Sequence, residues 1–154
     1  MKRQIIFFLV LVSYFTANAQ FIATMEVKEP IEGVCNQNGV YVILPFGNKK
    51  QTKAKSLLSD EEMEKRFNTI EYWKSHPEFE KEITFNLVIN CKGELVRQSF
   101  NNNENKTKDE ALNEKLLEIV ASFKEWKPAT IKKKKVDSSL FLTIKIKNGK
   151  VTLS

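Results

Sequence analysis

Residues 83–100 read ITFNLVINCKGELVRQSF, and this stretch decides the fold. In its first half, polar side chains alternate with the apolar ones Ile83, Phe85, Leu87 and Ile89, and Val88 is an exception to the alternation. A period of two predicts a strand with one buried face and one wet face. Gly93 can take the positive φ of a bulged turn, so we expect the second half to fold back as an antiparallel partner up to Phe100.

On the C-terminal side of this hairpin the pattern predicts a helix and a second alternating strand. Thr107 and Glu110 have the spacing of a capping box, and apolar residues at helical spacing continue over residues 109–123. The helix stops at the WKPA of residues 126–129. Four lysines follow, and apolar residues then alternate again over residues 139–147. Asn148-Gly149 predicts a turn into a short tail strand.

On the N-terminal side, Ser59 and Glu62 form another capping box, which predicts a helix to about Lys74. Residues 39–44, GVYVIL, predict a short strand. We therefore expect an α+β fold of two layers, a three-stranded antiparallel sheet with helices on one face. Its β-β-α-β core would follow a strand and a helix. The expected organisation is a domain over residues 59–154 and an N-terminal extension with a short strand over residues 20–58.

The first nineteen residues have the three parts of a secretory signal peptide. Lys2 and Arg3 are basic, residues 5–12 are apolar, and Ala17-Asn18-Ala19 supplies small residues for cleavage near Ala19. Cleavage there implies a periplasmic or secreted protein. A spanning helix needs about 20 apolar residues, whereas the apolar run at residues 5–12 has eight. We therefore do not read this run as a membrane anchor, and we expect no spanning segment in the mature chain.

The charge of the chain is mildly positive. Removing Lys2 and Arg3 lowers the formal net charge from +6 to +4, and acids are interspersed with the lysines. We therefore expect no nucleic-acid partner. Two lysine-rich stretches, residues 49–55 and 132–135, are interpreted as solvated loops, with an affinity for anionic surfaces as the alternative.

Cys35 and Cys91 are the two cysteines of the chain. In an exported protein they can form a disulfide that ties the N-terminal segment to the hairpin. The alternative is two unrelated thiols, because spacing alone does not show whether their Cα atoms come within about 7 Å.

Residues that could carry catalysis are scarce. His76 is the single histidine and lies beside a proline, and the chain has no Gly-x-Ser-x-Gly motif and no clustered metal ligands. Catalytic and metal sites need several positioned groups. We therefore expect no enzyme activity and no catalytic, cofactor-binding or metal-binding residues.

The hairpin FNLVINCKGELV at residues 85–96, the WKPA at 126–129 and the last alternating strand resemble the C-terminal domain of the bacterial energy transducer TonB. The resemblance covers about residues 79–147. It implies a periplasmic protein-binding module that serves transmembrane transport and contacts outer-membrane receptors, whose peptide adds beside the last strand. Carried onto this chain, the partner-binding edge strand is 139–147. Its outward residues are Ser139, Phe141, Thr143, Lys145 and Lys147.

The chain also departs from this family. A full transducer has a spanning helix and a proline-rich spacer, whereas this chain has a short apolar run and four prolines. It therefore resembles an exported domain of the family and not a complete transducer. The alternative is a secreted structural or inhibitor-like α+β domain with no transport role, in which Lys145 and Lys147 protect the edge from pairing.

Overall fold

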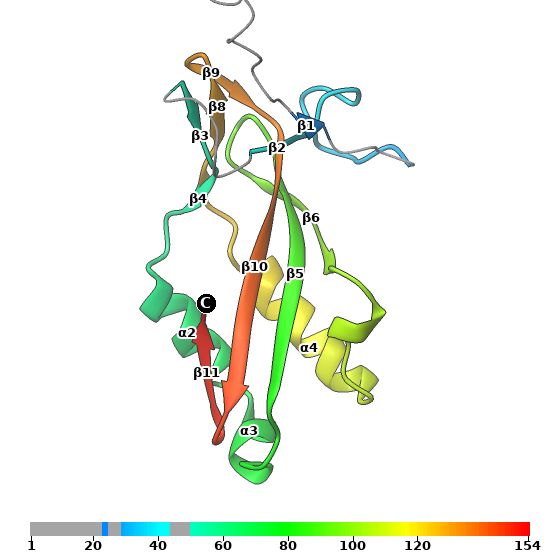
Figure 1. Ribbon diagram of the computed structural model, residues 1–154, viewed down its shortest axis with the longest axis vertical. Coiled ribbons are helices and arrows are strands. Elements are labelled where there is room, and N and C mark those ends of the chain that lie inside the picture. Colours follow the sequence, from blue (N-terminus) through cyan, green and yellow to red (C-terminus); the bar gives the residue numbers. More distant parts are fainter. Residues whose placement is uncertain (1–22, 25–28, 44–49) are drawn as a thin grey trace, which may run out of the picture.

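The computed structural model describes residues 23–24, 29–43 and 50–154 (Figure 1). The predicted signal peptide and its cleavage site lie outside these residues. The fold is α+β, as expected, with helices packed on one face of a sheet. Across the described ranges, no helix combines the length and the apolar character that membrane crossing requires.

The centre of the main sheet consists of the three strands that the sequence predicts. β5 (Lys81–Ile89) lies between β6 (Leu95–Phe100) and β10 (Ser138–Lys147), antiparallel to both. The sheet is wider than the expected three strands, because β11 (Lys150–Leu153) and β2 (Tyr41–Val42) pair with the two ends of β10. β1 (Ala23–Thr24) pairs with β2 and completes a sheet of six described strands.

The main core lies between this sheet and the helices α2 (Asp60–Phe67), α3 (Glu71–Ser75) and α4 (Glu110–Ala121). The inward side chains of β5 and β10 meet one apolar stripe from each helix, which is why their apolar residues recur with periods of two and about 3.6. The fully buried members include Phe67, Trp73, Phe85, Leu116 and Ile144.

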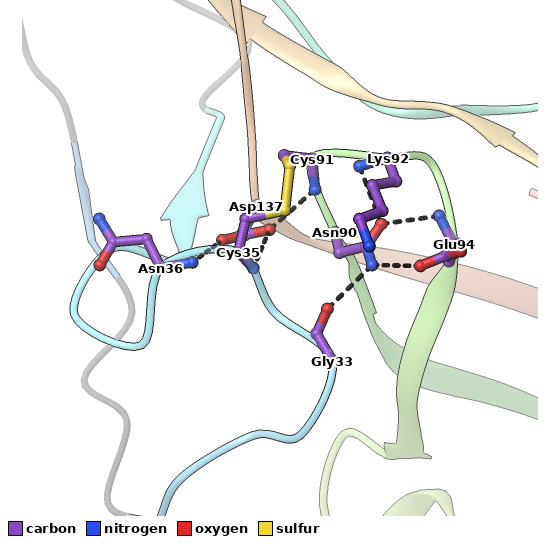
Figure 2. The surroundings of a disulfide bond; sticks show 8 residues. All are labelled: Gly33, Cys35, Asn36, Asn90, Cys91, Lys92, Glu94 and Asp137. Carbon is purple, nitrogen blue, oxygen red and sulfur yellow. Dashed lines mark hydrogen bonds between the residues drawn. A yellow bond between two sulfur atoms is a disulfide. The ribbon is translucent and has the colours of Figure 1, made fainter.

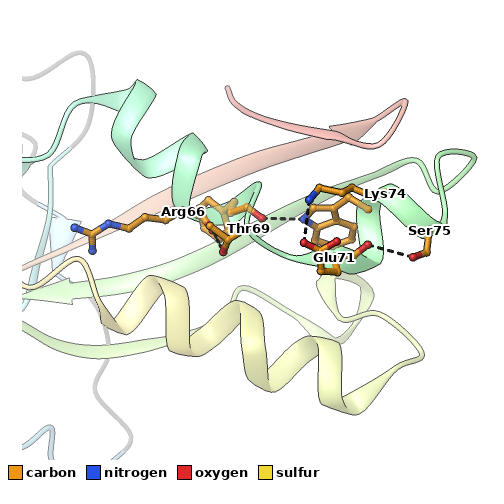
Figure 3. A network of polar contacts seen from close by, with 7 residues as sticks. Arg66, Thr69, Glu71, Lys74 and Ser75 are labelled. Atoms are coloured by element: carbon orange, nitrogen blue, oxygen red, sulfur yellow. Dashed lines mark hydrogen bonds and ion pairs between the residues drawn. The ribbon is translucent and has the colours of Figure 1, made fainter.

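The predicted helix from Ser59 to Lys74 is two helices. α2 ends at its cap Asn68, and Ile70 is extended before α3 begins. The hydroxyl of Thr69 donates to the carbonyl of Arg66 at 2.7 Å, which closes the last turn of α2 (Figure 3). Helical spacing continues across the break, so the periodicity alone does not reveal it.

The helix caps agree with the sequence at α2 and differ at α4. Ser59 and Glu62 form the predicted capping box, and the hydrogen bond from the Ser59 backbone holds the pKa of the Glu62 carboxyl below its ordinary value. α4 is capped by Asp109, whose carboxylate accepts from the Leu112 amide at 3.1 Å, and not by Thr107.

Two small sheets form where the sequence predicts loops. β8 (Ala129–Ile131) lies between β3 (Gln51–Thr52) and β9 (Lys134–Val136), and β4 (Lys55–Ser56) pairs with β7 (Trp126–Lys127). In Figure 1 the β3-β8-β9 sheet lies beyond the N-terminal end of β10. The two lysine-rich stretches are therefore brought together by strand pairing. A short 3₁₀ turn, η1 (Asn103–Asn105), precedes α4.

A second, smaller core explains the exception in the alternation of β5. Val88 points to the face of the sheet opposite the helices and is buried there by Ile31 and Val40. Residues 29–43 of the N-terminal segment therefore pack on the domain and contribute β2 to its sheet.

Candidate functional site

β10 presents alternating side chains to the two faces of the sheet. Its even-numbered residues pack into the main core, and its odd-numbered residues lie on the face away from the helices. The Ser154 amide donates to the carbonyl of Thr143 at 3.1 Å, across the edge that β5 does not occupy. Because backbone directions also alternate, Phe141 directs its amide and carbonyl to the same edge.

This edge of β10 is covered at both ends. Ser138 and Ser139 pair with β2, and residues 144–147 pair with β11. Between them, no strand from the described part of the chain pairs with residues 140–142. Within the predicted edge strand 139–147, pairing therefore occupies both ends.

Four of the five predicted edge residues already make contacts within the sheet. The Ser139 hydroxyl donates to the Asn86 side chain at 2.7 Å, and the hydroxyls of Thr143 and Thr84 are 3.1 Å apart. Two ion pairs occupy the others, Lys145 with Glu82 at 3.9 Å and Lys147 with Glu80 at 3.7 Å. Phe141 differs from these four, because it is a large apolar residue that is 59% exposed and its side chain makes no hydrogen bond or ion pair.

A pocket of about 350 Å³ opens beside this stretch of β10. Its lining is largely apolar and comes from β2, the segment between β3 and β4, and β10: Val42, Ile43, Lys53, Ala54, Ser138, Ser139, Leu140 and Phe141. The Ser138 hydroxyl is buried and has no hydrogen-bond partner among the described residues. The pocket therefore offers an apolar wall beside a strand edge with which no described strand pairs.

The outer edge of β11, in contrast, is closed by helix α2. The Asn68 side chain accepts from the Val151 amide and donates to the Val151 carbonyl, both at 2.9 Å, as a neighbouring strand would. The Glu64 carboxylate accepts from the Leu153 amide at 2.8 Å. These side chains leave no comparable opening on β11.

A disulfide and a buried carboxylate lie at the end of the sheet where β5 ends and β10 begins (Figure 2). Cys35 and Cys91 are bonded, with their Cα atoms 6.0 Å apart, which confirms the disulfide interpretation. Asp137 is 2% exposed and accepts from the backbone amides of Cys35, Asn36 and Cys91 at 3.1, 2.7 and 2.8 Å. These bonds fix the N-terminal segment to both the hairpin and the start of β10.

Asp137 was missed by sequence reasoning. The signal available was a single acid between a run of four lysines and an apolar strand. Its side chain lies close to both cysteine sulfurs, as a metal ligand would. The sulfurs are bonded to each other and the carboxylate accepts three amides, so this cluster acts as a structural clamp.

Asn90 ties the hairpin turn to the same segment (Figure 2). Its side-chain amide donates to the Gly33 carbonyl at 2.9 Å, and its carbonyl oxygen accepts from the amides of Lys92 and Glu94. The turn that follows β5 therefore supports the N-terminal segment and contributes nothing to the pocket.

Comparison with protein-family models, with curated proteins and with solved structures finds no match. The resemblance to the TonB C-terminal domain rests on the sequence features given above, and the function is argued from the open stretch of β10.

Proposed function

We propose that this chain is a periplasmic protein-binding module that takes an extended segment of an outer-membrane receptor as an added strand on β10. The open edge at residues 140–142, beside the exposed Phe141 and the apolar pocket, carries this proposal. An edge with free amide and carbonyl groups is completed by a peptide backbone, while pockets beside it select side chains. The resemblance to the TonB C-terminal domain suggests the receptor as the partner.

The neighbours of the open stretch limit what can bind. β2 ends at one side and β11 begins at the other, so the added strand spans about four residues at about 3.3 Å per residue. The backbone groups of Phe141 lie at the centre of this window. An apolar side chain of the peptide fits the wall formed by Val42, Ala54 and Leu140.

β6 is the other candidate edge, because it is an outer strand of the described sheet. Its pairing with β5 shifts between Val88 and Ile89, and such bulges are one way in which natural sheets protect their edges. Neither of the two large apolar side chains that are mostly exposed in the described residues, Leu57 and Phe141, belongs to β6. These differences favour the open stretch of β10.

The proposal is tested by selecting phage-displayed random peptides on the folded chain. Selected peptides are then titrated into ¹⁵N-labelled protein. We expect the largest amide shifts at residues 140–143 and slower hydrogen exchange at Phe141. Failure to select any binder, or shifts centred on residues 96–100 of β6, would contradict the proposal.

A pair of variants at one position separates backbone from side-chain recognition. Phe141→Pro removes the outward amide, and a proline is tolerated where the amide of an edge strand faces solvent. We expect Phe141→Pro to abolish peptide binding, whereas Phe141→Ala, which keeps the amide, weakens it. Circular dichroism checks that both variants fold. If Phe141→Pro does not fold, the amide mapping of the unmodified chain decides whether the peptide binds at this edge. Equal binding by all three proteins would exclude strand addition at this position.

A further inference from the structure

Eight lysines gather on the small sheets beyond the N-terminal end of β10. We call residues 50–56 and 126–136 the basic lobe; these two segments contain no acidic residue. Its lysines are all exposed: Lys50, Lys53, Lys55, Lys127, Lys132, Lys133, Lys134 and Lys135. The two segments are far apart in the sequence and meet through strand pairing and a hydrogen bond from the Lys132 amide to the Lys50 carbonyl at 2.8 Å. The lobe is therefore one surface of like charge.

The lysines of this lobe form no ion pairs with acids among the described residues. Lys55 lies directly opposite Lys127 on the neighbouring strand, and like charges in that position are destabilising. The ion pairs found among the described residues all lie elsewhere. Two acids flank residues 126–136. Glu125 is exposed and forms none of these ion pairs, and the carboxylate of Asp137 is buried and accepts from three backbone amides. The lobe therefore projects a positive potential that attracts a negatively charged partner.

The basic lobe and the open stretch of β10 meet at the pocket. Lys53 lines the same pocket as Leu140 and Phe141. A strand laid along the open edge therefore reaches the lobe when it continues past the pocket. We infer that the partner segment is an acidic peptide, with an apolar stretch for the pocket and aspartates or glutamates for the lysines. This inference rests on the proposed function and specifies its partner.

The chemistry of the lobe favours a peptide over other polyanions. Single-stranded nucleic acids are bound on several exposed aromatic side chains that stack successive bases. The described part of the lobe and its pocket offers one such side chain, Phe141, because Trp126 is 6% exposed. A lipid surface would use the lysines but leave the apolar pocket unfilled. A peptide uses both features. Carboxylates also suit the exposed hydroxyls of Thr52 and Thr130, which are 2.8 Å apart on adjacent strands.

The same peptide selection tests this inference. Clones selected on the unmodified chain should be enriched in Asp and Glu relative to the unselected library. The lobe variant Lys53→Gln, Lys133→Gln, Lys135→Gln should bind the selected peptides about tenfold more weakly, by loss of electrostatic attraction. The control variant Lys108→Gln, Lys115→Gln, Lys150→Gln removes three exposed lysines from other elements and should change the affinity less than about twofold. Raising NaCl from about 50 to about 500 mM should weaken peptide binding by the unmodified chain more than peptide binding by the lobe variant.

Each result has one consequence. Binders without acidic enrichment, or equal losses in the lobe and control variants, overturn the acidic partner and leave strand addition in place. No binders at all overturn the proposed function itself. Vesicles of phosphatidylglycerol serve as the competing probe. The inference is wrong, and the lobe is a lipid-binding surface, if two results are found together. The vesicles bind the unmodified chain but not the lobe variant, and the lobe variant binds the selected peptides as tightly as the unmodified chain does.

Discussion

The two ends of β10 differ in almost every respect that matters for binding. At the C-terminal end, β11 pairs with it, α2 closes the outer edge of β11, and Lys145 and Lys147 have acidic partners. Toward the N-terminal end, no described strand pairs with residues 140–142 and Phe141 is exposed. None of the ion pairs found among the described residues involves a lysine of the basic lobe. The same edge of β10 is therefore paired at residues 144–147 and has no described pairing partner at residues 140–142.

This contrast shows how a sheet is protected from unwanted pairing. The closed end uses side chains as substitutes for strands, with Asn68 bonded to both backbone groups of Val151. Among the described residues, no side chain substitutes for a strand in this way at residues 140–142. The place where protection is missing is therefore the place to look for a partner.

The largest expected effect comes from the core at the closed end. Phe67→Ala should lower the free energy of unfolding by about 3–5 kcal/mol, because the ring is fully buried and its removal leaves a cavity. Its ring centroid lies 5.6 Å from that of Phe123 and 6.1 Å from that of Phe85. Urea unfolding measured by circular dichroism gives the value. Leu57→Ala, at a side chain that is 64% exposed, is the control and should change it by less than about 0.5 kcal/mol. Similar effects from both would contradict the assigned core.

The disulfide should matter mainly at the open end. Replacing Cys35 and Cys91 by serine should cost about 2–4 kcal/mol, because the bond restricts the unfolded chain. Hydrogen exchange should then speed up at Tyr41 in β2 more than at Val151 in β11. The unmodified chain with reductant is the control. Equal acceleration at both amides would mean that the two ends unfold as one unit.

Opening the closed edge should cost less. Asn68→Ala should destabilise the chain by about 1–3 kcal/mol, because it leaves the amide and carbonyl of Val151 without partners. The Val151 amide should exchange faster, as measured by NMR. Thr69→Ala, which removes the hydrogen bond to the Arg66 carbonyl but no bond to β11, is the control and should leave the exchange rate of the Val151 amide unchanged. An unchanged exchange rate at Val151 would show that Asn68 does not protect this edge.

The smallest expected effect concerns charge. Lys55→Glu replaces a like-charged cross-strand pair with an opposite one and should stabilise the chain by about 0.2–1 kcal/mol. Lys147→Glu, at the balanced end, removes an ion pair and should destabilise it slightly. Both differences, measured by urea unfolding, should shrink in high salt. Shifts of the same sign would remove the electrostatic distinction between the two ends.

Local patterns in the sequence predicted the features that depend on neighbouring residues. The alternation of β5 and β10, the turn at Gly93, the capping box at Ser59 and the tail strand β11 are all confirmed. Each of these is determined by residues a few positions apart, so periodicity and capping chemistry report them directly.

The features that depend on distant residues were not predictable in this way. The pairing of β3 with β8 joins segments nearly 80 residues apart, and it converts two lysine-rich loops into one surface. The coverage of β10 by β2 and β11 likewise narrows the site to its middle. Val88 gave a signal, since an apolar residue on the wet face indicates a second contact, but the sequence does not say with what.

The buried carboxylate of Asp137 also has a consequence for the order of assembly. It accepts from the backbone amides of both Cys35 and Cys91, and we expect these bonds to bring the two thiols together before they are oxidised. Asp137 comes 46 residues after Cys91, and the template is therefore complete only when β10 has emerged and docked. We therefore expect the disulfide to form after β10 has docked on the sheet. Asp137→Asn should slow the loss of free thiols during oxidative refolding in a glutathione buffer, and an unchanged rate would show that the cysteines find each other without it.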